Sequence, residues 1–115
     1  MLLPLEKRHY EFLRRHGKKI VSQDVLFIVG EESLSNEKDC LKTHRLGFSI
    51  SKKCGNNVIR NRLRRIFRTA LDSFNYPKPL MIQVILKKGR SWSHAKKVNL
   101  NWSQRQCQVL DHLPF

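Results

Sequence analysis

The segment from about Val58 to Phe74 constrains the fold more than any other part of the chain, because its apolar residues recur at the three- and four-residue spacing of an α-helix. The apolar stripe consists of Ile59, Leu63, Ile66, Phe67, Ala70 and Phe74. Asparagines, which cap helix N-termini well, precede the segment, and Pro77 and Pro79 end it. A helix with such a stripe must cover an apolar layer formed by other segments.

Three segments have the composition of strands that would form this layer. Residues Lys19–Gly30 are β-branched and apolar with a polar break, which indicates two strands or one broken strand. Residues His44–Ser51 alternate, with Leu46, Phe48 and Ile50 on one face, and Leu80–Leu86 is an apolar run of strand length. The sequence therefore predicts a small sheet next to the helix.

Two further helices are expected near the ends of the chain. Pro4–His16 has helical spacing and stops at Gly17, and Ser91–Leu113 has a weaker pattern of the same period. The order of elements predicts an α+β or α/β domain with helices packed on a small mixed sheet. With 115 residues and 40% apolar content, one domain over residues 1–115 is expected.

The charge balance is strongly basic, with 23 Lys and Arg against 9 Asp and Glu and a formal net charge of +14. Such a surface attracts polyanions. No apolar run approaches the roughly 18 residues of a spanning helix, and Met1–Leu5 is too short for the core of a signal peptide. The three cysteines form no CxxC pair, so neither a disulfide framework nor a zinc site is indicated. We expect a soluble, cytoplasmic protein with no membrane partner.

The predicted helix at Val58–Phe74 carries its basic residues away from the apolar stripe. Arg60, Arg64 and Arg68 follow one another at i, i+4 spacing without an acid, and like charges at this spacing repel. A solvated helix face is the plain alternative, but ordinary surface helices mix charges of both signs. The polar face and its flanks comprise Arg60, Asn61, Arg62, Arg64, Arg65 and Arg68. We name these six residues the basic ridge and predict that it binds phosphates.

The turn before the helix extends this surface. Lys52 and Lys53 add two cations, and the Gly55-Asn56-Asn57 backbone can direct N–H groups outward at the helix N-terminus. The helix dipole favours an anion at that position. Turn and helix together predict a phosphate-binding edge.

The stretch from Arg45 to Arg68, RLGFSISKKCGNNVIRNRLRRIFR, resembles the signature of the bacterial ribonuclease P protein family. The strand, the Lys-Lys-x-Gly turn and the Arg-Asn-Arg core match in order, and weaker resemblance extends from about Tyr10 to Gly89. The resemblance implies a fold like domain 2 of ribosomal protein S5, with a left-handed βαβ crossover, although general rules favour the right-handed form.

The resemblance also implies partners and sites. The basic ridge would bind the catalytic RNA of ribonuclease P, and a cleft between that helix and the open sheet face would hold the 5′ leader of precursor tRNA. Leader contacts are expected from Tyr10, Arg14, Arg45, Phe48, Lys52 and Lys53. The family tends to have aromatic residues where this chain has Arg14 and Ile28, so base stacking depends mainly on Tyr10, with Phe27 and Phe48 left open.

The sequence offers no catalytic or metal-binding constellation. Its acids are scattered, and its five histidines form no paired motif for general acid–base chemistry. The resemblance implies that the RNA performs the hydrolysis with its own Mg²⁺ and that one protein monomer joins one RNA. Two alternatives stay open, a generic nucleic-acid-binding protein of ribosomal or architectural type and, less favoured, a small nuclease.

Overall fold

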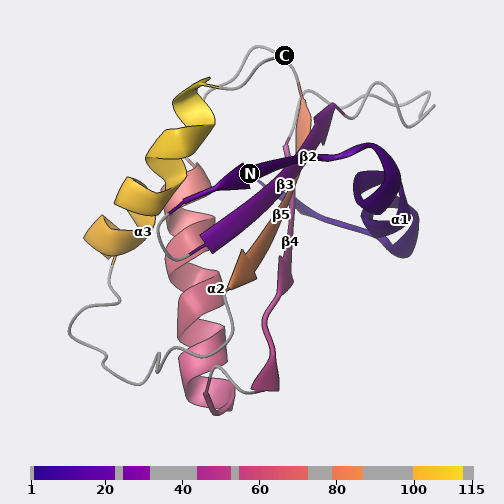
Figure 1. The fold of residues 1–115 in the computed structure, drawn as a ribbon. Helices are drawn as coiled ribbons and strands as arrows, with labels where there is room; N and C mark the ends of the chain where they lie inside the picture. Colours follow the sequence, from indigo (N-terminus) through magenta and orange to yellow (C-terminus); the bar gives the residue numbers. More distant parts are fainter. Residues whose placement is uncertain are drawn as a thin grey trace.

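The protein folds as a five-stranded mixed sheet with helices on both faces (Figure 1). The computed structural model describes residues 2–22, 25–31, 44–52, 55–72, 79–86 and 100–112. In chain order the elements are β1 (Leu3–Pro4), α1 (Lys7–His16), β2 (Lys18–Val21), β3 (Val25–Glu31), β4 (Arg45–Ser49), α2 (Asn57–Asp72), β5 (Leu80–Leu86), α3 (Leu100–Cys107) and the 3-10 helix η3 (Gln108–His112). The expected α+β architecture is confirmed.

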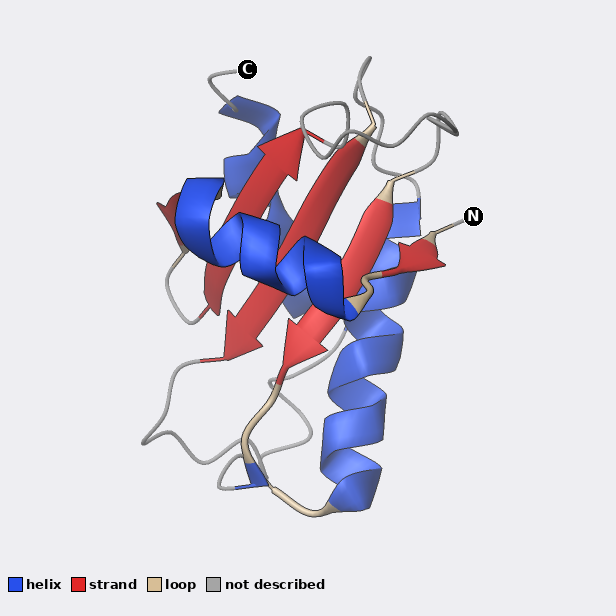
Figure 2. Cartoon of the chain, turned by 90° about the vertical axis from the view of Figure 1, so that its right-hand side faces the viewer, coloured by secondary structure: helices blue, strands red, loops and turns tan. Residues whose placement is uncertain are grey.

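The strands are ordered β1-β4-β5-β3-β2 across the sheet. β4 runs parallel to β1 and β5, whereas β3 is antiparallel to β5 and β2. Between the parallel neighbours β4 and β5 the chain passes through α2 on the side of the sheet opposite α1 (Figure 2). Viewed with α1 in front and both strands pointing down, β5 lies to the left of β4 and α2 lies behind, which makes the crossover left-handed.

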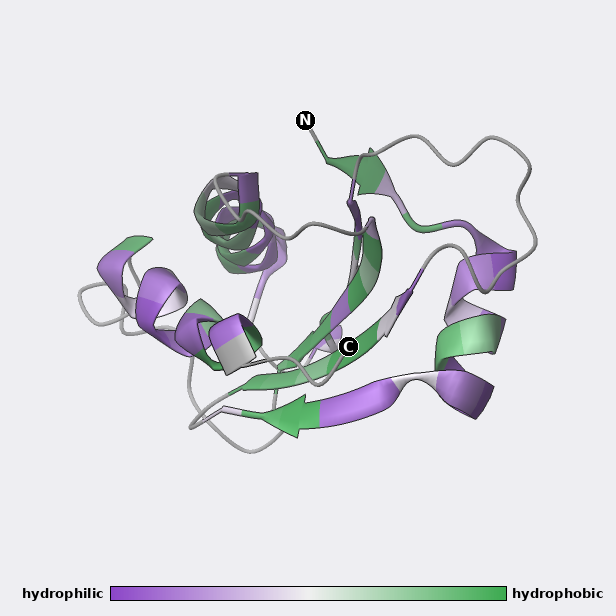
Figure 3. Cartoon of the chain, turned by 90° about the horizontal axis from the view of Figure 1, so that it is seen from above, coloured by the Kyte–Doolittle hydropathy of each residue, from purple (hydrophilic) through white to green (hydrophobic). Residues whose placement is uncertain are grey.

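One face of the sheet is closed by α2 and α3 (Figure 3). Alternate residues of β3, β4 and β5 point into this layer because successive side chains of a strand face opposite sides. The Phe67 ring meets Phe27 and Trp102 edge to face, with centroids 6.3 and 5.4 Å apart. The buried residues of this core are Val25, Phe27, Val29, Leu46, Leu63, Ile66, Phe67, Ala70, Leu71, Leu80, Ile82, Val84, Leu86, Trp102, Cys107 and Leu110.

The other face carries only α1, which crosses the strands at an angle (Figure 2). A small cluster of Leu5, Leu13, Ile28 and Met81 joins the helix to the sheet. Gly30 lets the helix come close, because a Cβ there would lie 3.0 Å from the Leu13 side chain. We call this side the open face, since α1 covers only part of it.

Two boundaries differ from the predictions. The first helix begins at Lys7 rather than Pro4, because residues 3 and 4 form β1 instead. The Leu3 and Leu5 N–H groups donate to backbone oxygens of His44 and Leu46, and Pro4, which has no N–H, tolerates the edge of the sheet. The last helix begins at Leu100, and residues 91–99 of the predicted range lie outside the described residues.

The main predicted elements are confirmed. α2 covers most of the range expected for the amphipathic helix, β5 has the expected bounds, and the segment Lys19–Gly30 forms two strands. Phe74 lies outside the described residues. Over the described part of the chain, none of the helices has the length and apolar character needed to cross a membrane.

Candidate nucleic-acid interface

The N-terminus of α2 is fixed by its own backbone and side chains. The Asn56 side-chain oxygen accepts a hydrogen bond from the Ile59 N–H at 3.0 Å, which is an N-cap. Gly55 has φ +153°, and a Cβ there would lie 2.9 Å from the Ile59 side chain, so the turn requires glycine. Lys52 is exposed just before this turn, and Lys53 lies outside the described residues.

The basic ridge lies on the outer side of α2. Asn61, Arg65 and Arg68 are exposed, and Arg60, Arg62 and Arg64 are partly exposed at the flanks. These positions agree with the helical wheel, because Leu63 and Phe67 point into the core. The predicted ridge is therefore present as a continuous surface about 12 Å long from Arg60 to Arg68, at 1.5 Å per residue.

Two arginines of the ridge donate hydrogen bonds to neutral side chains, which do not compensate their charge. Arg64 donates to the Asn61 side-chain oxygen at 2.9 Å, and Arg60 donates to that of Asn57. Both acceptors are neutral amides. The Arg60 Nε is buried and has no hydrogen-bond partner in the described part of the chain. These two hydrogen bonds hold the Arg60 and Arg64 guanidinium groups in place without an acidic acceptor, so their charge can act on an anion.

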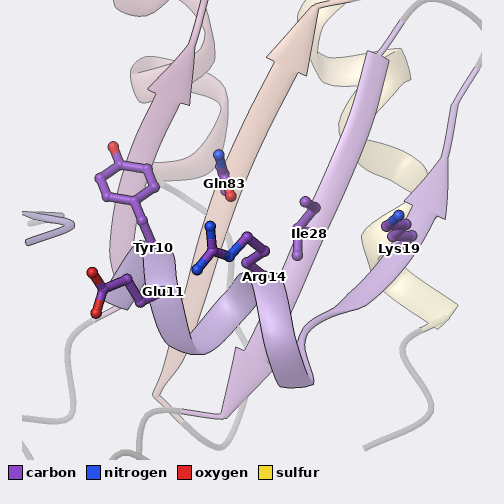
Figure 4. A pocket seen from close by; sticks show the side chains of 6 residues that line it. All are labelled: Tyr10, Glu11, Arg14, Lys19, Ile28 and Gln83. Atoms are coloured by element: carbon purple, nitrogen blue, oxygen red, sulfur yellow. The ribbon is translucent and has the colours of Figure 1, made fainter. Parts of the chain in front are cut away.

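The open face contains a hollow of about 320 Å³ between α1 and the sheet (Figure 4). Six residues line it, three from α1 and three from strands β2, β3 and β5: Tyr10, Glu11, Arg14, Lys19, Ile28 and Gln83. The Tyr10 ring lies directly over Gly47 of β4, where a Cβ would be 2.1 Å from the phenol oxygen. An aromatic ring, two cations, one carboxylate, an amide and an aliphatic side chain therefore surround one concave site.

Two histidines and the one described cysteine have structural surroundings. Buried His9 accepts a hydrogen bond from the Glu6 N–H at 2.9 Å. The His44 Nδ1 accepts from the Leu80 N–H at 3.1 Å, and burial lowers the pKa of that imidazole. Burial, with Asp111 nearby, raises the pKa of the Cys107 thiol to about 12, so this thiol is unreactive at neutral pH. The described residues contain no group of three metal-ligating side chains.

The family model described as Ribonuclease P matches residues 5–107 of this chain. The chain belongs to the ribonuclease P family. A ribonuclease P protein component from Natranaerobius thermophilus is 34% identical over 79 residues, which are 67% of this chain and 60% of that protein. One from Syntrophus aciditrophicus is 32% identical over 92 residues, or 76% of this chain and 69% of that protein. The chain spans 58% of the relative from Clostridium beijerinckii.

Solved ribonuclease P proteins share this fold. The structure from Thermotoga maritima superposes with a TM-score of 0.73 at 20% identity and covers 93% of both chains. The Staphylococcus aureus protein gives a TM-score of 0.72 at 20% identity, covering 96% of this chain and 94% of that one. At these identities the likeness concerns the fold, and it agrees with the sheet order and helix placement described above.

The structure separates the residues that the resemblance to the ribonuclease P family had grouped as leader contacts. Tyr10 and Arg14 line the hollow. Arg45 is partly buried at the start of β4, where its guanidinium donates to the Pro4 carbonyl at 3.1 Å. Phe48 is partly buried and packs against the core of the closed face, on the side of the sheet away from the hollow. Phe27 is fully buried in the same core and offers no stacking surface.

The leader cleft was expected between the basic helix and the open face, but α2 packs on the closed face. One hollow lies on the open face against α1, and another lies between Arg68 of α2 and residues of β1 and β4. The error arises because strand alternation shows which residues share a face, but not which face a given helix covers. The basic ridge and the hollow on the open face consequently belong to opposite sides of the sheet.

Three residues of the hollow were missed from the sequence: Glu11, Lys19 and Gln83. One signal was available, since Gln83 interrupts the apolar run of β5. A polar residue at such a position indicates that one face of the strand is not covered. No comparable signal marks Lys19 or Glu11, which reach the hollow only through tertiary packing.

Proposed function

We propose that this protein is the RNA-binding protein subunit of ribonuclease P. In this role it assists a catalytic RNA in the endonucleolytic removal of the 5′ leader from precursor tRNA. The observation that carries the proposal is the basic ridge on α2, within a chain that the ribonuclease P family model matches over residues 5–107. The apolar stripe of the same helix is used by the core, so the arginines are presented on a rigid support.

The two sides of the sheet have separate roles in this proposal. The basic ridge binds phosphates of the RNA subunit, a contact that depends on salt because counterions are released. The hollow on the open face binds the single-stranded leader. There Tyr10 stacks on a base, which is worth about 1–3 kcal/mol, while Arg14 and Lys19 neutralise phosphates. Lys52 and Lys53 keep the leader contact that the resemblance to the family implies for them.

The hydrolysis is assigned to the RNA subunit. The described side chains do not fit a Mg²⁺ site, because they provide no cluster of carboxylates, so we assign the Mg²⁺ of the holoenzyme to RNA phosphates. The protein contributes electrostatic stabilisation and holds the leader. We further propose a monomer in a 1:1 ribonucleoprotein and a cytoplasmic location, where precursor tRNA is made in bacteria.

Reconstitution tests the proposal directly. A bacterial ribonuclease P RNA is assayed for cleavage of precursor tRNA at low Mg²⁺, with and without this protein. We expect strong stimulation by the protein and no cleavage by the protein alone. An unstimulated RNA would contradict the proposal. Cleavage by protein alone, lost in one His→Ala variant, would instead identify a small nuclease.

The basic ridge on its own would also suit a generic binder of double-stranded nucleic acid, such as a ribosomal or architectural protein. The hollow on the open face distinguishes the two, because a generic binder has no use for it. Competition with an equal-length RNA duplex decides between them. The ribonuclease P subunit should prefer substrate with a leader, and a generic binder should release both equally.

A further inference from the structure

A second hollow lies at the edge of the sheet, where β1 passes beside α2. Four apolar residues from the start of the chain and from β4, with one arginine of α2, line a space of about 300 Å³: Leu2, Leu3, Pro4, Leu46 and Arg68. A neighbouring space of about 470 Å³ shares Leu2 and Arg68 with it and adds Thr69 and Asp72 of α2. We call the two spaces together the edge hollow.

The edge hollow forms because β1 extends the sheet beyond the strip that α2 covers. Leu46 of β4 is buried in the closed-face core, whereas Leu2 is only partly buried against this core and Pro4 is exposed. Pro4 pairs with Leu46 in the parallel register, so both side chains point to the closed face. Figure 2 shows β1 at the edge of the sheet with α2 behind it. The apolar strip from Leu2 to Leu46 is therefore left partly open.

The wall opposite this apolar strip is polar, because it consists of exposed residues of α2. Arg68, Thr69 and Asp72 are exposed, and Arg68 is also the last residue of the basic ridge. The Thr69 hydroxyl donates to the Arg65 carbonyl at 3.0 Å, so its proton is engaged within the helix. Asp72 is the only acid of α2 and lies one turn beyond Arg68. A phosphate is therefore favoured at Arg68 and repelled beside Asp72, whereas an uncharged group can enter the apolar space.

We infer that the edge hollow receives one unpaired base of the RNA subunit, while the adjoining phosphate lies on Arg68. The inference rests on the proposed function, since the RNA that reaches the edge hollow is the RNA bound along the basic ridge. It adds a contact that depends on shape to a surface whose other contacts are electrostatic.

Continuity with the basic ridge selects this occupant. Arg65 lies about 4.5 Å before Arg68 along the helix axis, at 1.5 Å per residue, so an RNA strand held by both arginines continues to the edge hollow. Bases of loops and bulges can leave the RNA stack and pack on protein side chains. A second copy of this chain is disfavoured, because its net charge of +14 is repelled by the same ridge.

The size of the edge hollow fits a single base. The space between the apolar strip and Arg68, about 300 Å³, is at the lower end of the roughly 300–1,000 Å³ typical of small-molecule sites. The walls that meet the base are aliphatic rather than aromatic, so the contact should be at the weak end of base stacking. We therefore expect its loss to weaken RNA binding about 5- to 10-fold.

The experiment uses the protein bound to a bacterial ribonuclease P RNA. Thr69→Trp fills the edge hollow from α2, and Leu3→Ala removes part of its apolar wall from β1. Gln104→Trp, on the exposed side of α3, is the matched control. Affinity is measured over a range of salt concentrations, and unpaired bases are mapped with dimethyl sulfate for A and C and a carbodiimide for G and U. Thermal unfolding of each variant shows whether it is folded.

We expect Thr69→Trp to weaken binding about 5- to 10-fold with an unchanged salt slope, because no phosphate contact is removed. Leu3→Ala should weaken binding less, and Gln104→Trp should leave it unchanged. One unpaired base should be protected by the wild type and by Gln104→Trp, and should react in the complex with Thr69→Trp. An abasic nucleotide at that position should lower wild-type affinity to the level of Thr69→Trp, which a simple steric clash of the tryptophan would not do.

Three results would overturn the inference while the subunit role stands. Wild-type affinity in folded Thr69→Trp, or no base that becomes reactive in it, would mean that no base enters the edge hollow. A dimer of the free protein that Thr69→Trp dissociates would assign the edge hollow to a second copy. A loss confined to precursor tRNA that carries a leader would assign it to the leader. If the wild-type protein does not bind the RNA at all, the proposed function itself fails.

Discussion

The two faces of the sheet are built differently, although the same strands form both. On the closed face, α2 and α3 bury sixteen of the described residues in one apolar core. On the open face, α1 and the sheet bury a cluster of four apolar residues between them. Polar and charged side chains from α1 and the sheet fill the rest of the open side around a hollow. A well-packed layer holds its helices rigidly, whereas a thin one leaves strand surface available to a ligand.

This difference shows how one small domain can support two kinds of RNA contact. The basic ridge needs only fixed charges on a rigid helix, and the closed-face core supplies that rigidity. The open-face hollow needs concave shape, an aromatic ring and oriented polar groups, which a fully packed face would not leave accessible. Because the sheet separates the two, each contact can be changed without altering the other directly.

The largest effect is expected from removing the closed-face core at Phe67. Phe67 is fully buried between Phe27 and Trp102, so Phe67→Ala should lower the free energy of unfolding by about 3–5 kcal/mol. Urea denaturation measures this loss. Phe12→Ala on α1 is the control, because Phe12 is only partly buried. Equal losses in the two variants would mean that the open face contributes as much stability as the closed face.

A smaller and more local effect is expected at Gly47, beneath Tyr10. A Cβ there would overlap the Tyr10 phenol, so Gly47→Ala should displace the ring and cost about 1–3 kcal/mol of stability. The leader contribution to precursor tRNA affinity should fall with it, while affinity for the RNA subunit is retained. Adding Tyr10→Ala should recover part of the stability, because the overlapping ring is gone while the Leu5 side chain still lies 2.7 Å from the added Cβ. Loss of RNA-subunit binding in Gly47→Ala would show that the two faces are not separable.

The basic ridge is tested by the salt dependence of binding. Arg65 is exposed, and each phosphate contact contributes about 0.7–0.9 to the slope of log affinity against log salt concentration. Arg65→Ala should reduce the slope for the isolated RNA subunit by about one contact. Arg15→Ala on α1 removes the same charge from the open-face side and should leave that slope unchanged. A slope unaffected by Arg65→Ala would place this residue in solvent.

The sequence predicted the closed face better than the open one, for a physical reason. Helical periodicity is local, so the stripe containing Leu63 and Phe67 identified α2 and placed the basic ridge opposite it. The pairing of Leu3 and Pro4 with Arg45 and Leu46 of β4 joins residues 42 positions apart and leaves no local pattern. Alternation grouped Leu46 with Phe48, but only tertiary packing decides that this group faces α2.

The smallest expected effect concerns a residue that serves both faces through the sheet itself. His44 joins three strands, since its carbonyl accepts from the Leu3 N–H of β1 and its Nδ1 accepts from the Leu80 N–H of β5. Both contacts form at the edge where β4 begins. Weakening them should therefore destabilise the support of the basic ridge and of the hollow together.

The sign of the pH effect follows from the neutral state of this ring. Burial lowers the pKa of His44 in the folded protein, so below about pH 6.5, the ordinary histidine pKa, the unfolded chain takes up the proton more readily. The stability that His44 contributes is complete above that pH and is lost as the pH falls toward the lowered pKa of the folded state. Because the half-buried ring remains partly solvated, the loss should be a few tenths of a kcal/mol.

His44→Asn isolates this contribution, because an asparagine oxygen can accept the same Leu80 N–H without titrating. Urea denaturation at pH 7.5 and pH 5.5 should show a larger loss of stability in the wild type than in the variant. An equal loss of stability in the wild type and in His44→Asn would mean that His44 does not cause the pH effect.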